Sequence, residues 1–306
     1  KWSLTAIGVG AIIGGGIFVL TGTGAYYHAG PALAISFIIA GIACVFAALC
    51  YAEFASIIPV EGSAYAYAYG TVGEIFAWAM GWCLILEYAM ASMAVSVSWS
   101  GYFNKFLKIF NIHLPAYLTS DPASYTGDGF SMNLPAFILV LLITALLVKG
   151  TKEAAGANNL IVLMKTSAVI FVIIAGVYII FSNTDLYNAV DGVKNWKPFI
   201  PDQIRIKNSE GDMVSAYGIK GIISGAAAIF FAYIGFDAVS TQAGEAINPK
   251  KDVPFAIIAS LLICTALYIC VSLVLTGMMH YTDFNPEGKY PDAIKAPVAY
   301  AFEIAG

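Results

Sequence analysis

Long runs of apolar residues, separated by short polar or proline- and glycine-rich stretches, dominate the chain. A helix needs about 20 predominantly apolar residues to cross a bilayer. By that measure the pattern predicts seven membrane spans, followed by an amphipathic helix or the start of an eighth span at 296–306. The predicted spans are 3–26, 31–58, 73–103, 134–148, 157–181, 218–247 and 255–279.

The connections between these spans differ in polarity. After the second span, 59–63 breaks the chain, and Tyr65, Tyr67 and Tyr69 then form an aromatic stretch typical of a membrane interface. We expect a membrane-parallel or re-entrant segment there. The other predicted connections are a polar loop at 111–133, a charged hairpin at 149–153, a long charged loop at 182–217 and a tight charged turn at 248–254.

Composition supports a polytopic all-α protein in a lipid bilayer. The chain is 59% hydrophobic and 11% charged, whereas soluble domains contain about 25% charged residues. Its net charge is −4 and Arg205 is its single arginine, so no basic patch for nucleic acid is expected. The five cysteines lie in apolar runs without metal or disulfide spacing, and no metal or cofactor is expected.

The ends and the loops bear on completeness and orientation. The sequence opens at Lys1 without an initiator methionine and closes at Gly306 without a clear stop, so we expect a fragment. Lysines at 149–152 and 250–251 lie in short loops on one side, which favours a cytoplasmic N-terminus in a plasma-membrane protein.

A glycine cluster lies inside the first predicted span. Five of the nine residues from Gly8 to Gly16 are glycine, and each glycine in a helix interior costs about 1 kcal/mol relative to alanine. Gly10 and Gly14 have the spacing of a close helix-packing motif. Alternatively, the helix unwinds here, and the freed amides bind an anion such as a carboxylate. A dinucleotide loop is excluded because no strand precedes the cluster.

The sixth span contains a second candidate interruption between Phe230 and Asp237. Gly235 disturbs the helical pattern, and Asp237 places an ionisable group between two apolar halves. Such a residue marks a functional site by default, or it caps a half-helix that begins there. Both interpretations require a break in the helix.

The two candidate interruptions are five spans apart. Because five is odd, a repeat of five helices would place its second copy upside down, and paired broken helices in inverted repeats indicate a transporter site. The pattern therefore predicts a first repeat at 1–182, a long extramembrane loop at 183–217 and an incomplete second repeat at 218–306.

Two further ionisable residues lie within predicted spans. Lys165 is about eight residues into the fifth span, or ~12 Å at 1.5 Å per residue. Its stem can reach an interface, or its apolar neighbours can lower its pKa and give it a proton-linked role. Glu87, near the middle of the third span, either holds helices together, pairs with a buried cation or contacts substrate.

Several ordered motifs resemble the amino acid–polyamine–organocation superfamily, most closely its cationic amino acid transporter branch and bacterial relatives. The resemblance covers essentially the whole chain. The motifs are the Gly8-to-Leu20 segment, Tyr51-Ala-Glu53-Phe, Pro59-x-x-Gly62-Ser63-Ala64-Tyr65, Phe231-Ala-Tyr-Ile-Gly-Phe-Asp237-Ala-Val-Ser240 and Asn248-Pro249-x-x-Asp252-x-Pro254.

This resemblance implies a leucine-transporter-like inverted-repeat fold with helices 1 and 6 broken, and alternating access around them. Substrate carboxylate would lie on amides of Gly14, Gly15 and Gly16, near the carbonyl of Ile12. The substrate amino group would meet carbonyls of Phe231, Ala232 and Ile234, where Phe231 also matches a gating aromatic. Lys165 matches a lysine that, in proton-coupled members, occupies the place of a sodium ion in sodium-driven relatives, which implies a proton-coupling role. Glu87 and Asp237 match polar positions nearby.

The sequence departs from the family pattern at two positions. The family usually has Ser or Thr where this chain has Gly15, so a side-chain hydroxyl contact is missing. The family also usually has paired glutamates where this chain has Gly244-Glu245.

The sequence therefore predicts a secondary transporter of amino acids that uses protons as the coupling ion. The alternatives are an amino-acid exchanger and a transporter-like amino-acid sensor or receptor. A retinal protein would need a lysine in the last predicted span, 255–279, which has none. An enzyme is not expected, because the spans contain no catalytic dyad or metal cluster.

Overall fold

The computed structural model describes residues 1–305 except 121, 123, 124, 126, 128, 150, 183–190 and 208–211. In this part of the chain, five helical segments are long and apolar enough to cross a membrane. They are Gly16–Ile57, Glu74–Ile109, Leu160–Phe181, Gly218–Ala243 and Pro249–Met278, and two shorter apolar helices are Trp2–Ile12 and Leu134–Val148. Seven spans were expected. The predicted span 3–26 is divided, because its first helix ends at Ile12 and the chain from Gly16 onward is joined to the next span. The helix at 134–148 is shorter than the other spans.

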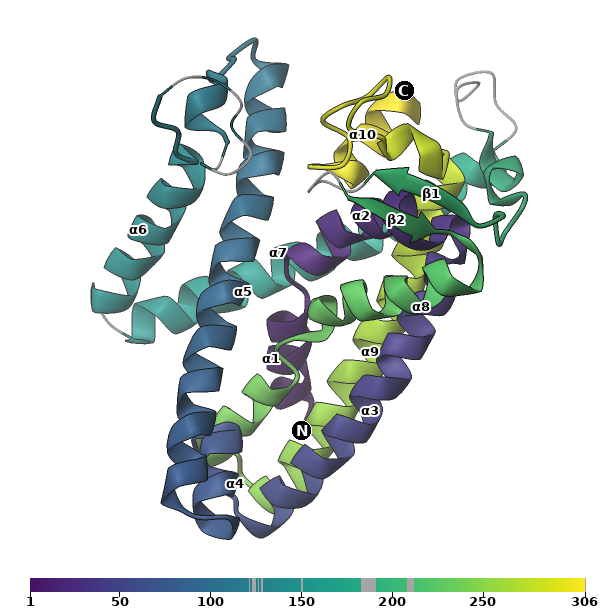
Figure 1. Ribbon diagram of the computed structural model, residues 1–306. Helices are drawn as coiled ribbons and strands as arrows, with labels where there is room; N and C mark the ends of the chain where they lie inside the picture. The colour runs from purple at the N-terminus through teal and green to yellow at the C-terminus, as the bar shows by residue number, and fades with distance from the viewer. Residues whose placement is uncertain are drawn as a thin grey trace.

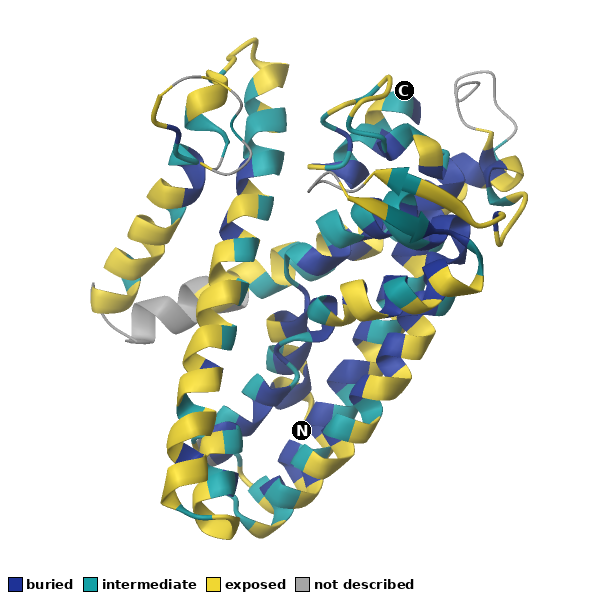
Figure 2. Ribbon diagram, in the orientation of Figure 1, coloured by how far each residue is buried: buried dark blue, intermediate teal, exposed yellow. Residues whose placement is uncertain are grey.

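A bundle of two long and two short helices forms the better-buried half of the molecule (Figure 1 and Figure 2). The helices α3 (Leu33–Ile57) and α9 (Pro249–Met278) lie side by side, α8 (Gly218–Ile229) packs on α3, and α1 (Trp2–Ile12) packs on α9. At its centre the Tyr268 ring lies 5.4 Å from that of Phe37 and 5.3 Å from that of Tyr233. All three side chains are completely buried.

The other helices are far more exposed (Figure 2). The short α4 (Ser63–Thr71) and α6 (Leu134–Lys149) both pack on α5 (Glu74–Ile109), and α7 (Thr151–Phe181) runs from α6 to α9. Their exposed side chains include large apolar ones, such as Trp78, Leu142 and Phe171. An apolar surface of this extent is typical of helices that face lipid or further helices.

The chain between α1 and α3 continues as a helix of mixed geometry. A π-helical turn at Gly16–Leu20 leads into α2 (Thr21–Gly24) and a second π-helical turn at Ala25–Ala29. At Gly30 the backbone has φ +59°, which L side chains rarely adopt. This glycine and the following proline start the turn into α3.

The long loop contains structure that the sequence pattern did not predict. Strands β1 (Ile204–Lys207) and β2 (Met213–Ala216) form an antiparallel hairpin, with Ile204 opposite Ala216. A 3₁₀ helix at Gly192–Trp196 fastens the loop to α9: the Asn195 amide donates to the Gly277 carbonyl (2.9 Å) and the Trp196 indole donates to the Leu273 carbonyl (3.1 Å).

Three connections differ from, or complete, the predicted pattern. The prediction of a tight turn at 248–254 is wrong, because α9 already begins at Pro249. A proline fits the first turn of a helix. The aromatic stretch forms α4, and α10 (Pro297–Ala305) covers most of 296–306. Gly150 and Gly306 and the side chains of Lys149, Lys152, Glu153 and Glu245 lie outside the described residues.

Gly16→Ala tests one close approach in this packing. A Cβ at Gly16 would lie 2.6 Å from Ala232 Cβ and 2.7 Å from Ala232 Cα, so the two segments must separate, and we expect destabilisation of about 1–3 kcal/mol. The matched control is Gly81→Ala in α5, where the new Cβ meets only the Tyr65 ring, at 3.3 Å. Thermal unfolding in detergent measures both; equal midpoints would contradict the predicted overlap.

Candidate functional site

The first interruption follows α1. After Ile12 the chain leaves helical geometry, with Ile13 at φ −70° and ψ 97°, and the π-helical turn begins at Gly16. The Ile13 amide still donates to the Val9 carbonyl, at 3.0 Å. The last carbonyls of a helix have no partner within it, so this end of α1 needs partners from elsewhere.

The second interruption follows α8. A 3₁₀ turn at Phe230–Tyr233 leads to Ile234 at φ −54° and ψ 136° and to Gly235 at φ +111°, and a second 3₁₀ segment covers Asp237–Glu245. A Cβ at Gly235 would also lie only 2.7 Å from the Ala11 carbonyl oxygen. Both the backbone angle and this approach to α1 therefore require glycine.

The two interrupted segments run antiparallel and side by side. The first half of one contacts the second half of the other: α1 contacts Asp237–Glu245, and Gly16–Leu20 contacts Phe230–Tyr233. The two segments meet closely at Gly16 and Ala232, where a Cβ on Gly16 would overlap Ala232. Of the residues singled out by the sequence, Ile12, Gly16, Ala232 and Ile234 thus lie around one point.

A tyrosine from α9 joins the two interruptions. The Tyr268 hydroxyl lies 2.8 Å from the Ile12 carbonyl oxygen and 2.8 Å from the Ala232 carbonyl oxygen. The hydroxyl carries one proton, so it donates to these two acceptors in alternation or shares the proton between them. Sequence reasoning missed Tyr268; its signal was a polar-tipped aromatic in the middle of an apolar span.

The carbonyls at the second interruption are partly engaged. The Phe231 carbonyl accepts from the Ile234 amide at 3.3 Å, and the Ala232 carbonyl accepts from Tyr268. Phe231 itself is half-buried. Because a carbonyl oxygen has two lone pairs, each of these groups can accept one further hydrogen bond.

Lys165 meets the carbonyl end of α1. Its ammonium donates to the Gly10 carbonyl from α7. The approach depends on a glycine, because a Cβ at Gly10 would lie 2.5 Å from Val162 Cγ2 on the same face of α7. The C-terminal end of a helix dipole attracts a cation. The ion pairs found among the described residues do not include Lys165.

Asp237 is a buried carboxylate held by hydroxyls. Its side chain accepts from the Tyr88 hydroxyl at 2.7 Å and from the Ser63 hydroxyl at 3.4 Å, and Asp237 is 3% exposed. Both donors come from other helices, so the carboxylate ties α5 and α4 to the second interruption. Glu87, next to Tyr88 on α5, is half-buried and close enough for its charge to repel that of Asp237.

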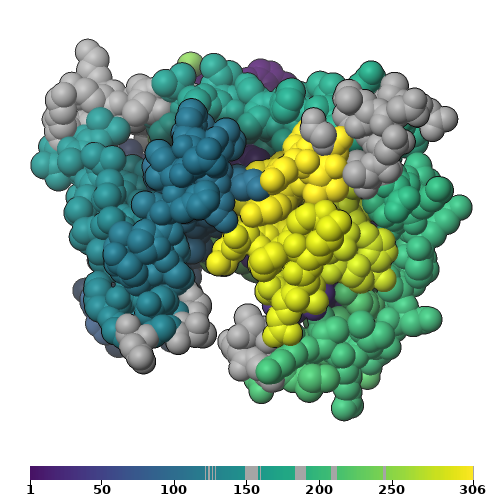
Figure 3. Space-filling model, turned by 90° about the horizontal axis from the view of Figure 1, so that it is seen from above, coloured from purple at the N-terminus to yellow at the C-terminus, as the bar shows by residue number. Residues whose placement is uncertain are grey.

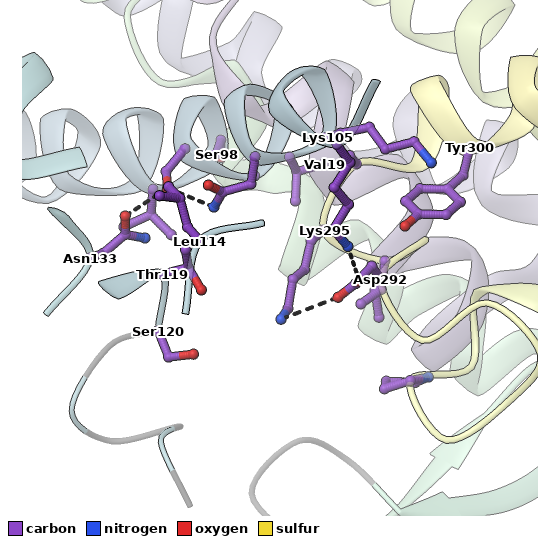
Figure 4. A pocket seen from close by; sticks show the side chains of 18 of the residues that line it. Val19, Ser98, Lys105, Leu114, Thr119, Ser120, Asn133, Asp292, Lys295 and Tyr300 are labelled. Carbon is purple, nitrogen blue, oxygen red and sulfur yellow. Dashed lines mark hydrogen bonds and ion pairs between the residues drawn. The ribbon is translucent and has the colours of Figure 1, made fainter. Parts of the chain in front are cut away.

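A pocket of about 590 Å³ lies between the C-terminal part of α5, the helical segment 16–29 that follows the first interruption (the resumed first helix) and the segment before α10. Lys105, Lys108, Lys295, Asp292 and Tyr300 are among its lining residues (Figure 4). Of the residues that the sequence singled out, none lies among the described residues that line it.

Charged side chains close one wall of this pocket. The Lys108 ammonium lies 2.8 Å from an Asp292 oxygen and that of Lys295 lies 3.6 Å from the other. Burial raises the pKa of Asp292, but the hydrogen bond and charge of Lys108 and the charge of Lys295 lower it by more, so this pKa lies below its ordinary value.

Lys105 extends the same contact. It pairs with Glu303 and lies 3.5 Å from the centroid of the Tyr300 ring, a cation–π geometry. Seen from above, the end of α5 accordingly meets the C-terminal segment (Figure 3).

Comparison with known proteins identifies relatives of the chain. A family model described as amino acid permease matches residues 1–289. The chain is 47% identical over 305 residues to the methylthioribose transporter of Bacillus subtilis (strain 168) and 46% identical over 306 residues to the branched-chain amino acid permease BcaP of the same organism. It is 35% identical over 306 residues to the vacuolar cationic amino acid transporter 4 of Arabidopsis thaliana.

These matches cover the chain almost completely but the relatives only in part. They include 100% of the chain for both Bacillus proteins and 99% for the Arabidopsis protein, against 58%, 58% and 45% of the relatives' own lengths. A family match over residues 1–289, helices apolar enough to cross a membrane and relatives named as transporters or permeases together assign this chain to the amino acid permease family of multi-pass membrane transporters, not to an enzyme family.

Proposed function

We propose that the chain forms the substrate-binding part of a secondary active transporter that carries amino acids with protons by alternating access. The observation that carries this proposal is the antiparallel contact of two interrupted helices at Gly16 and Ala232. It brings amide groups from the start of one helical segment and carbonyl groups from the end of another to the same place, in a chain whose spans are apolar.

The substrate groups follow from this polarity. Backbone amides at a helix start bind anions, so the carboxylate of the amino acid would lie on Gly14, Gly15 and Gly16. The ammonium group would lie on the carbonyls of Phe231, Ala232 and Ile234, with the Ile12 carbonyl nearby. These roles require no side-chain charge.

Lys165 is the proposed proton-coupling residue. When protonated, its ammonium holds the last turn of α1 through the Gly10 carbonyl; when neutral, it loses most of its attraction for the negative end of that helix. Protonation can therefore favour one position of α1. Asp237 provides polar support by holding α4 and α5 against the second interruption through Ser63 and Tyr88, and Glu87 would be a second polar group beside it.

The same arrangement suggests the architecture of the complete site. The two interruptions are five predicted spans apart and antiparallel, as an inverted repeat requires. We propose that 1–182 forms the first repeat, with its first helix broken, and that 218–306 begins the second, with helix 6 broken. The plasma membrane and a cytoplasmic N-terminus complete the proposal, with Lys250 and Lys251 at the cytoplasmic end of α9.

A second candidate substrate is methylthioribose, because a relative 47% identical to the chain is named for its transport. That molecule has neither a carboxylate nor an ammonium group, so the same amides and carbonyls would have to meet hydroxyl groups. Uptake of radiolabelled L-leucine, L-arginine and methylthioribose into proteoliposomes, with a full-length protein that contains this chain, separates the candidates. Uptake of methylthioribose alone would overturn the amino-acid proposal.

Gly15→Leu should abolish amino-acid binding in that protein. The side chain would enter space that is already filled, because even a Cβ at Gly15 lies 2.5 Å from Ser98 Oγ. Binding of L-leucine or L-arginine by scintillation proximity measures the effect. Gly81→Ala in α5, where the new Cβ meets only the Tyr65 ring at 3.3 Å, serves as the glycine control. Unchanged affinity in Gly15→Leu would count against the site.

Lys165→Ala should remove the pH dependence of uptake. The variant keeps the substrate groups of the backbone but loses the titrating ammonium at Gly10, so exchange of substrate across the membrane should persist while proton-driven accumulation is lost. Proteoliposomes with and without a pH gradient measure the two activities. Accumulation that still follows the pH gradient would exclude the coupling role.

Tyr268→Phe should weaken both stability and binding. Removing the hydroxyl leaves two buried carbonyls one donor short, and an unmade buried hydrogen bond costs about 1–3 kcal/mol. Tyr69→Phe, on the exposed surface of α4 (57% exposed), is the control. Thermal unfolding and substrate affinity are measured together, and a variant indistinguishable from the unsubstituted protein in both would show that the bridge is dispensable.

A further inference from the structure

The side chain of Ser98 on α5 occupies the space beside Gly15. A Cβ built on Gly15 would lie 2.5 Å from Ser98 Oγ and 2.9 Å from Ser98 Cβ. The neighbouring Gly14 is less crowded, with Val95 Cγ2 at 3.3 Å. No side chain therefore fits at position 15 while Ser98 is present, and any side-chain hydroxyl at this point of the interruption belongs to α5.

The Ser98 hydroxyl keeps the capacity to bind a ligand. In the structure it donates to the Ala94 carbonyl, one turn earlier in α5, at 2.8 Å. That carbonyl belongs to a regular helix, so the hydroxyl proton can turn to a stronger acceptor without leaving a carbonyl that has no partner. Ser92 makes the same type of bond, to the Tyr88 carbonyl at 2.8 Å, but is exposed.

Ser98 also belongs to the pocket described above. It lines the cavity of about 590 Å³ together with Val19 and Thr23 of the resumed first helix, and Lys105 and Lys295 line the same cavity further along (Figure 4). Ser98 is thus a polar side chain that both faces an open cavity and touches the glycine interruption.

We propose that Ser98 contacts the substrate and determines its affinity, by donating its hydroxyl hydrogen bond to the carboxylate held at the Gly14–Gly16 amides. This inference rests on the proposed function. It divides recognition of the carboxylate between the main chain of the first helix and one side chain of α5. Position 15 and position 98 together have room for one hydroxyl-bearing side chain, and the chain places it at 98.

The first test is Ser98→Ala in a full-length protein that contains this chain, with L-leucine and L-arginine as probes. A hydrogen bond to a charged group contributes enough for a loss of affinity of about tenfold or more. Ser98→Cys keeps the approximate shape with a weaker donor and should give an intermediate loss. Ser92→Ala removes a hydroxyl with the same local bond and should leave affinity unchanged.

The second test moves the hydroxyl across the contact. Gly15→Ser alone should lose binding and unfold at a lower temperature, because its Cβ overlaps Ser98. Adding Ser98→Gly removes the overlap and returns one hydroxyl to the site, so Gly15→Ser/Ser98→Gly should recover affinity to within a few-fold of the unsubstituted protein. A role confined to folding predicts recovery of the unfolding temperature without this recovery of affinity relative to Ser98→Ala.

The outcomes separate this proposal from the function on which it rests. Absence of uptake of both probes by the unsubstituted protein overturns the proposed function and this role with it. Uptake that Ser98→Ala leaves unchanged in affinity overturns the role of Ser98 alone. A swapped variant that folds but binds no better than Ser98→Ala does the same.

Discussion

The rest of this structure depends on how the backbone groups of two interrupted helices find hydrogen-bond partners in an apolar interior. A helix that stops inside a membrane leaves carbonyls and amides that water cannot reach, and each unmade bond is costly. Here the carbonyl ends meet side chains: Lys165 from α7 at Gly10, and Tyr268 from α9 at Ile12 and Ala232. The interruptions are stable only because two other helices deliver these donors to the right places.

Delivery of those donors depends on close packing. Gly10 lets α7 approach α1, and Gly16 lets the first helix approach Ala232, in the manner of small residues at membrane helix interfaces. The aromatic cluster of Phe37, Tyr233 and Tyr268 then fixes α9 against α3 and the second interruption. The Tyr233 hydroxyl adds a hydrogen bond to the Phe37 carbonyl, at 2.8 Å. Packing and interhelical hydrogen bonds are therefore inseparable here.

The sequence indicated where helices lie and where the first one ends, but it did not indicate which side chains contact the interruptions. Hydropathy located most helices to within a few residues, and the glycine run marked the segment in which α1 ends, because glycine is costly in a helix wherever it lies. Pro249 was misread as part of a turn, although proline also begins helices. Tyr268 and Ser98 escaped notice because their importance arises from neighbours more than 80 residues away, at Ile12 and Gly15. Whether the residues gathered there bind substrate stays a prediction.

A site built from main chain has a limited power to select. Amides and carbonyls that bind the carboxylate and ammonium groups shared by all amino acids cannot distinguish one amino acid from another. Two relatives with 47% and 46% identity to this chain carry the names of chemically different substrates, methylthioribose and branched-chain amino acids. In the proposed site, selection between substrates would therefore lie in side chains around the backbone groups. In the described part of the chain, Ser98 and Val95 of α5 lie directly against the glycine interruption. Ser98 would bind the carboxylate that all amino acids share and so set affinity, which leaves discrimination between amino acids to other side chains around the site.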